Sequence, residues 1–310
     1  MLLDKLINSK PVITLFFIVF CLIFFSIPLI NTSFYNLFNT LHINYILVGL
    51  SGLLIPSLHA VGLNNLIYEN NVIKKNNLII APTYLLLTTP FLSEPKLWIC
   101  GLLLLFFLIN LLKCYQKDYP LKQLFNAGSI IAILSMISPI TICLFVLILV
   151  AIVIFSNPNW RLFVSALLGL SLPYLFLFSL TYCLDWEYRW IEIPISVSFS
   201  NIDLLLASQV AIFWYGALTV LLLFSFFELF SWLYKKSIRS RKSFIFLMIY
   251  FSLTIVISLF SDLNSLYLAL TPATIIMGNY LIYSRNRKFA NFLFIVFLVS
   301  SFYYRYTIVL

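Results

Sequence analysis

The densest group of charged and aromatic side chains in this chain is the segment 185–194, whose sequence is DWEYRWIEIP. It holds Asp185, Glu187, Glu192 and Arg189, although only 9% of the 310 residues are charged. A carboxylate can act as a general base toward a hydroxyl, and an arginine can bind a phosphate through two parallel hydrogen bonds. The segment therefore predicts either a site for a phosphate-bearing substrate or a place where a membrane protein meets water.

The two interpretations differ in the conformation and depth that they require. As a lid over an outer cavity, the segment offers Arg189 to a lipid phosphate, with Lys96 as a second phosphate contact and Asp185, Glu187 or Glu192 as base. This needs an extended segment, because alternation then puts residues 185, 187 and 189 on one face, whereas a helix pairs Asp185 with Arg189. As a juxtamembrane segment, it places its aromatic rings at headgroup depth, which such rings prefer.

The composition indicates the solvent in which these residues must be positioned. Hydrophobic residues make up 63% of the chain and the mean hydropathy is +1.05, whereas a soluble domain has about 25% charged residues. The apolar stretches are long, as spanning helices require, and lack the ten-residue alternation of membrane strands. The sequence predicts an all-α, polytopic membrane helix bundle forming a single transmembrane domain over residues 1–310, with no soluble domain.

Hydropathy predicts about eleven transmembrane segments, two pairs of which contain members too short for a full span. The short pairs, 78–92 with 97–112 and 124–138 with 139–156, are hinged at Pro90, Pro95 and Pro139. They are expected to be either tight hairpins or re-entrant segments. The eleven segments are 11–31, 44–64, 78–92, 97–112, 124–138, 139–156, 162–184, 204–232, 243–261, 265–283 and 289–308.

The distribution of basic residues predicts the orientation, because short cytoplasmic loops of membrane proteins accumulate Lys and Arg. With a cytoplasmic N-terminus and an extracytoplasmic C-terminus, all 19 Lys and Arg residues except Lys96, Arg189 and Arg305 fall on the cytoplasmic side. The net charge of +9 is then a topology signal and not evidence for nucleic-acid binding. The runs 234–242 and 283–288 are either anionic-lipid contacts or simple topogenic loops.

Few other residues have types and spacings that could do chemistry. The five cysteines show no metal-ligand spacing, no nucleotide or metalloprotease motif is present, and two histidines are too few for a histidine-rich di-iron site. No cofactor and no metal are expected. Glu228 is the one acid inside a predicted span, and His59 is expected either to hydrogen-bond between helices or to belong to a site.

Three stretches carry a resemblance to a known class of enzymes. They are FNAGSIIAILSMISPITICLFVLILVAIVIF (125–155), SDLNSLYLALTPATIIMGNYLIY (261–283) and LNNLIYENNVIKKNNLIIAPTYLLLTTPF (63–91). They resemble the proline-hinged half-spans, the late span and the cytoplasmic turn of GT-C-type polyprenol-phosphate-dependent glycosyltransferases. The whole chain also resembles an uncharacterised family of bacterial multi-pass inner-membrane proteins.

The glycosyltransferase resemblance implies a GT-C-like arrangement and a polyprenyl-phosphate-linked substrate. The first outer loop, NTSFYNLFNTLHIN (31–44), holds no carboxylate, so the resemblance implies His42 as the base there. Two hypotheses follow. The chain either handles lipid-linked glycans in cell-envelope assembly, or it is a non-catalytic scaffold or subunit that binds other membrane proteins. Membrane lipids are expected partners in both cases.

Overall fold

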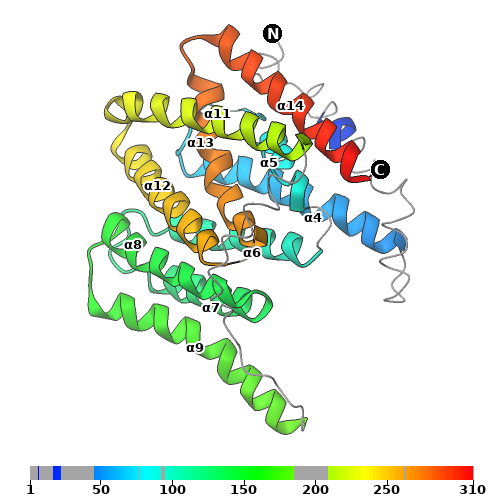
Figure 1. Ribbon diagram of the computed structural model, residues 1–310. Helices are drawn as coiled ribbons and strands as arrows, with labels where there is room; N and C mark the ends of the chain where they lie inside the picture. The colour runs from blue at the N-terminus through cyan, green and yellow to red at the C-terminus, as the bar shows by residue number, and fades with distance from the viewer. Residues whose placement is uncertain are drawn as a thin grey trace. The chain divides into compact units, whose positions relative to one another are not determined.

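The structure, a computed structural model, describes residues 6, 17–21, 45–75, 77–91, 95–184, 209–261 and 263–309. These residues fold into helices and no strand forms among them, which confirms the predicted all-α class (Figure 1). The α-helices are α4 (Tyr45–Glu69), α5 (Ile80–Leu87), α6 (Pro95–Leu112), α7 (Leu121–Ile137), α8 (Phe145–Phe155), α9 (Trp160–Cys183), α11 (Gln209–Trp232), α12 (Ile238–Leu259), α13 (Leu270–Tyr283) and α14 (Arg287–Val309). Short 3-10 helices are η2 (Thr89–Phe91), η3 (Pro139–Leu144), η4 (Leu233–Lys235) and η5 (Leu263–Ala269).

Five helical stretches in the described part of the chain are long and apolar enough to cross a membrane. This supports a multi-pass membrane protein, although the predicted number of eleven segments is not confirmed. The predicted segment 11–31 lies almost wholly outside the described residues. The five stretches are Trp160–Cys183, Gln209–Lys235, Ile238–Leu259, Asn264–Tyr283 and Arg287–Thr307.

The four segments of the predicted proline-hinged pairs form shorter helices. The predicted span 78–92 is the eight-residue helix α5 followed by η2, and eight residues reach only about 12 Å. Because a bilayer core is about 30 Å thick, α5 alone cannot cross it. The stretches Lys96–Leu112, Leu121–Ile137 and Pro139–Phe155 are apolar helices shorter than a typical span.

Proline and threonine explain where α5 ends. Pro90 has no backbone N–H and disfavours helical geometry in the residue before it. The hydroxyls of Thr88 and Thr89 donate to the carbonyls of Leu85 and Leu86, at 2.7 and 2.6 Å. These bonds satisfy carbonyls that would otherwise lack a partner at the end of a buried helix.

The chain divides into two compact units, which alternate along the sequence. Unit 1 consists of Met1–Leu102, Phe199–Ser237 and Leu270–Leu310, and unit 2 of Leu103–Ser198 and Ile238–Ala269. Among the described helices, unit 1 holds α4, α5, α11, α13 and α14, and unit 2 holds α7, α8, α9 and α12. Helix α6 carries the chain from unit 1 into unit 2.

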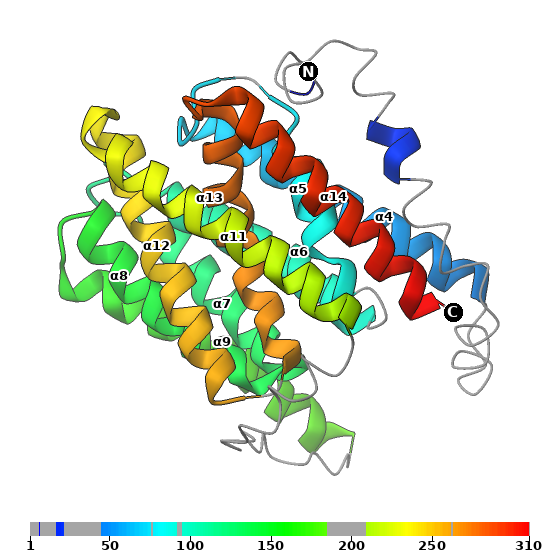
Figure 2. The same cartoon turned by 45° about the horizontal axis from the view of Figure 1, so that its top comes forward.

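Unit 1 is built around α13, on which every residue from Leu270 to Ile282 is buried. Helices α11 and α5 pack on α13, and α4 packs on α5. Helices α11 and α14 run antiparallel side by side (Figure 2): Phe224 meets Phe289 near one end, and Trp214 meets Phe297 farther along. Unit 1 therefore has two ends, which α14 connects over about 35 Å.

Unit 2 depends on a close crossing of α7 and α9 at two glycines. A Cβ atom on Gly128 would collide with the carbonyl of Ala166, and one on Gly169 with the carbonyl of Phe125. Small residues at such a crossing let two backbones approach closely, as is common for helices in membranes. Ser165 Oγ also donates to the Leu121 carbonyl at 2.9 Å, so backbone and side chains both hold this pair.

Candidate functional site

The predicted site residues are for the most part not described by the structure. Those that lie outside the described residues are Asp185, Glu187, Arg189, Glu192 and His42. Lys96 is described and lies exposed in the first turn of α6. The predicted lid over an outer cavity therefore stays a prediction.

Helix α14 carries a charged residue on its buried face. Its buried positions recur every three or four residues, which places them on one side of a helix. They begin at Ala290, continue through Phe294 and Phe297 to Ser301, and end at Arg305, which is 5% exposed. The guanidinium of Arg305 is thus on the side of α14 that faces the interior of unit 1.

An indole and two phenols surround the same turn of α14. Trp214 of α11 donates its Nε1–H to Ser301 Oγ at 3.0 Å, and its ring lies 5.7 Å from that of Tyr304. Tyr215 and Tyr304 are close enough to interact electrostatically. We call Trp214, Tyr215, Ser301, Tyr304 and Arg305 the arginine cluster.

The arginine cluster can act as a donor site for an oxyanion. A guanidinium presents a planar set of N–H donors that matches a phosphate, and phenol hydroxyls can add further hydrogen bonds. The sequence contained a signal for it, because Arg305 is one of three basic residues on the side predicted to be poor in them, and it lies in a predicted span. Only the fold shows that Arg305 is buried and which aromatic residues accompany it.

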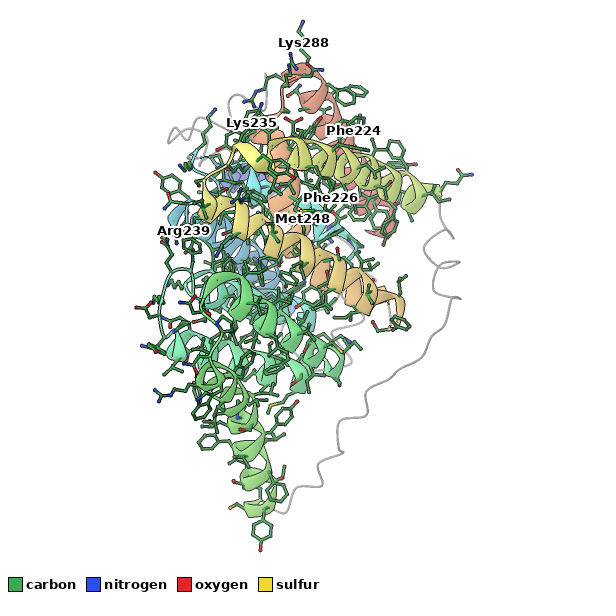
Figure 3. The ribbon with its side chains drawn as sticks, turned by 90° about the vertical axis from the view of Figure 1, so that its left-hand side faces the viewer. Phe224, Phe226, Lys235, Arg239, Met248 and Lys288 are labelled. Atoms are coloured by element: carbon green, nitrogen blue, oxygen red, sulfur yellow. The ribbon has the colours of Figure 1, made fainter. Side chains whose placement is uncertain are left out.

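The opposite end of unit 1 gathers basic residues from three loops. Lys236, after α11 and η4, donates from Nζ to Asn279 Oδ1 of α13 at 2.6 Å, and its Nζ lies 4.9 Å from the centre of the Tyr283 ring. The Tyr283 hydroxyl lies near the backbone of Lys74 and Lys75 in the α4–α5 loop. Arg287, at the start of α14, donates to the Leu281 carbonyl at 3.2 Å. We call this region the basic end, and Figure 3 shows its Lys235 and Lys288 toward the same end of unit 1.

His59 and Tyr84 form a buried polar pair between α4 and α5. Tyr84 Oη and His59 Nδ1 are 2.9 Å apart, and the two rings are stacked with centroids 4.1 Å apart. A Cβ atom on Gly101 would lie 3.1 Å from both of these polar atoms, so a glycine at this position leaves room for the pair. The expectation that His59 hydrogen-bonds between helices is confirmed.

No group of three or more His, Cys, Asp or Glu side chains that could hold a metal occurs in the described part of the chain. The cysteines are free: Cys21, Cys100 and Cys114 are buried, and Cys143 and Cys183 are exposed. The arginine cluster and the basic end each bring several donor groups together among the described residues.

The chain belongs to a family of unknown function, DUF6427, whose model matches residues 1–310. No curated protein and no solved structure is significantly similar to the chain. The resemblance to an uncharacterised family is thereby confirmed, and the resemblance to the GT-C-type glycosyltransferases stays a prediction.

Proposed function

We propose that this member of a family of unknown function is a multi-pass protein of the bacterial cytoplasmic membrane that holds a phosphate-bearing lipid at the arginine cluster. In its finer form, the proposal is a single transmembrane domain with a GT-C-like arrangement that handles a polyprenyl-phosphate-linked glycan in cell-envelope assembly. The N-terminus and the basic end then lie on the cytoplasmic side, and the arginine cluster lies toward the extracytoplasmic side.

The observation that carries this proposal is the burial of Arg305 on an apolar helix that is long enough to cross a membrane. A charged side chain at membrane depth is costly, and such residues mark substrate and ion sites by default. A phosphate fits this position because it accepts two parallel hydrogen bonds from a guanidinium. The neighbouring Tyr304 and Trp214 suit the boundary between headgroups and acyl chains.

The residues singled out from the sequence take secondary roles in this proposal. In the finer form of the proposal, Arg189 and Lys96 would contact a lipid phosphate. The base toward an acceptor hydroxyl would be Asp185, Glu187, Glu192 or His42.

Lipid binding by the purified full-length protein tests the proposal directly. The probe is undecaprenyl phosphate, and the readout is the amount retained per protein in native mass spectrometry. We expect Arg305→Gln to weaken retention by about tenfold or more, because a charge-assisted bidentate contact is lost. The retention by Arg305→Lys should lie between that of the wild type and that of Arg305→Gln, since lysine keeps the charge without the planar fork.

The matched control is Arg161→Gln, which removes an exposed arginine from the start of α9. It should retain the lipid as the wild type does. Equal retention by Arg305→Gln and the wild type would refute the proposal. If Arg305→Gln fails to fold, unchanged retention by a folded Arg305→Lys protein would refute it as well.

A second candidate function is a non-catalytic scaffold or subunit of a membrane complex. It is favoured by α9 and α11, whose spanning windows are only 17% and 22% buried inside the chain. Such faces can contact other helices as well as lipid. Cross-linkers can be placed at Leu175 and Phe227, both of which are exposed. In intact membranes, a scaffold should then yield one dominant protein adduct. A diffuse set of adducts would argue against a scaffold.

A further inference from the structure

The basic end holds a lysine that the fold draws away from water. Lys236 is half-buried and bonds to Asn279 of α13, which is 1% exposed. A lysine that served only as a topology signal would need only to project into the cytoplasm. The Lys236–Asn279 bond instead fixes the position of one ammonium against α13.

Asn279 has a donor that the protein does not use. Its Oδ1 accepts from Lys236, and its Nδ2 is buried without a hydrogen-bond partner. The amide cannot be turned around, because its NH₂ group would then oppose an ammonium that also only donates. A buried amide donor without an acceptor is unfavourable, so this position calls for an acceptor that the chain does not supply.

The loops around the pair carry positive charge, whereas the acids Glu69 and Glu228 lie on the adjoining helices α4 and α11. No acidic residue occurs in three loops: the α4–α5 loop (Asn70 to Leu78), the turn after α11 (Leu233 to Ser237) and the turn between α13 and α14 (Ser284 to Lys288). Their exposed cations are Lys74, Lys75, Lys235, Arg285 and Lys288. A surface of this kind attracts anionic headgroups at a membrane.

Aromatic rings indicate the depth of the pair relative to a bilayer. Trp232, at the end of α11, stacks on Tyr283, at the end of α13, with centroids 6.1 Å apart. Lys235 Nζ lies 5.9 Å from the centre of the Trp232 ring. Trp and Tyr collect at headgroup level and lysines reach outward from it, so Lys236 and Asn279 lie near the phosphate layer.

We infer that Lys236 and Asn279 form a binding site for the phosphate of an anionic phospholipid in the leaflet that the basic end faces. A phosphate oxygen accepts hydrogen bonds from Lys236 Nζ and Asn279 Nδ2, and the surrounding loop cations bind the remaining charge. This site is separate from the arginine cluster and does not depend on the function proposed there.

The experiment uses the full-length protein in nanodiscs of phosphatidylcholine with or without phosphatidylglycerol. Its readout is the preferential retention of phosphatidylglycerol on the protein in native mass spectrometry. The key variant is Asn279→Asp, whose carboxylate still accepts from Lys236 but repels a phosphate. We expect about tenfold weaker retention, because one buried donor is lost and one like charge is added.

The matched control is Asn286→Asp, which adds the same charge to an exposed residue in the turn between α13 and α14. It should reduce retention by no more than about twofold, as expected for a screened surface charge. Wild-type retention by Asn279→Asp would overturn the inference, and so would an equal loss in both variants, which would indicate only a diffuse charge effect. Inorganic phosphate in excess is the last control. If it displaces phosphatidylglycerol and occupies the site equally well by itself, the site binds the free anion, and the inference is overturned.

If Asn279→Asp proves unfolded in a thermal scan, Lys236→Gln replaces it, with Lys235→Gln as its control. Retention must then fall for the Lys236 variant and persist for the Lys235 variant. Equal retention by both would contradict the inference.

Discussion

At the scale of single residues, Lys236 is a cation whose surroundings favour its neutral form. Burial lowers the pKa of Lys236 from 10.5 to about 8. Between these two values the unfolded chain binds more protons than the folded one, so the stability of the fold rises with pH in this window. Below pH 8 both states are protonated, and keeping the charge away from water costs stability. The other ionisable groups at this end are Glu228, Tyr280, Tyr283, Lys235, Arg285, Arg287, Lys288 and the lysines of the α4–α5 loop.

The unfolding temperature in phosphatidylcholine nanodiscs should therefore rise between pH 8 and pH 10 in the wild type. This rise should be absent from Lys236→Met, which has no charge to desolvate, and present in Lys235→Met, which alters an exposed neighbour. A parallel pH dependence in all three proteins would show that Lys236 is not the titrating group.

The residues that the sequence singled out and those that the fold brings together overlap little. Lys236 and Arg305 were visible in the sequence as members of a charge distribution, and His59 as a polar residue in an apolar span. Asn279 gave no signal, because an asparagine in a predicted span has no distinguishing spacing. Its importance comes from α13, which places Asn279 opposite the turn after α11. Asn279 and Lys236 of that turn are 43 residues apart in the chain.

At the scale of elements, the close approach of α7 and α9 depends on Gly128 and Gly169. Replacing Gly169 with alanine improves the local helix propensity by about 1 kcal/mol but places a methyl group against the Phe125 carbonyl. Overpacking of this kind costs about 1–3 kcal/mol. We expect Gly169→Ala to lower the unfolding temperature.

Gly216 of α11 is the matched control, because a Cβ atom there meets nothing within 4 Å. Gly216→Ala gains the same helix propensity without a collision and should raise the unfolding temperature or leave it unchanged. If the two alanine variants behave alike, the α7–α9 crossing is not as tight as the structure has it.

The same scale shows why the spans were harder to predict than the helices. Hydropathy places helices at 80–87, 95–112 and 121–137 within a few residues, because apolar runs between prolines leave few alternatives. It does not reveal which of them cross a membrane. Helix α5 is wholly buried inside unit 1, and burial against protein and burial in lipid select the same apolar residues.

At the scale of the whole molecule, the predicted topology puts the basic loops on one side of the membrane. Within unit 1 the contacts of Lys236 with Asn279 and of Tyr283 with the α4–α5 loop bring three of these loops together. We expect single cysteines at Asn71, Asn286 and Lys117, placed in a chain without its native cysteines, to react with an impermeant maleimide only from the cytoplasmic side. Labelling of Asn286→Cys and Lys117→Cys from opposite sides would contradict the predicted topology.

The sequence by itself determined the class of this protein. Its apolar content and long uncharged stretches require helices in a membrane, because each backbone group must find its partner within its own segment when no water is present. The positions of Lys and Arg predicted the orientation for a similarly local reason. The tertiary structure decided which polar residues meet. Trp214 bonds to Ser301, and Lys236 bonds to Asn279, in each case between segments far apart in the chain. Such pairings follow from the packing of whole helices, which no local pattern of hydropathy or charge encodes.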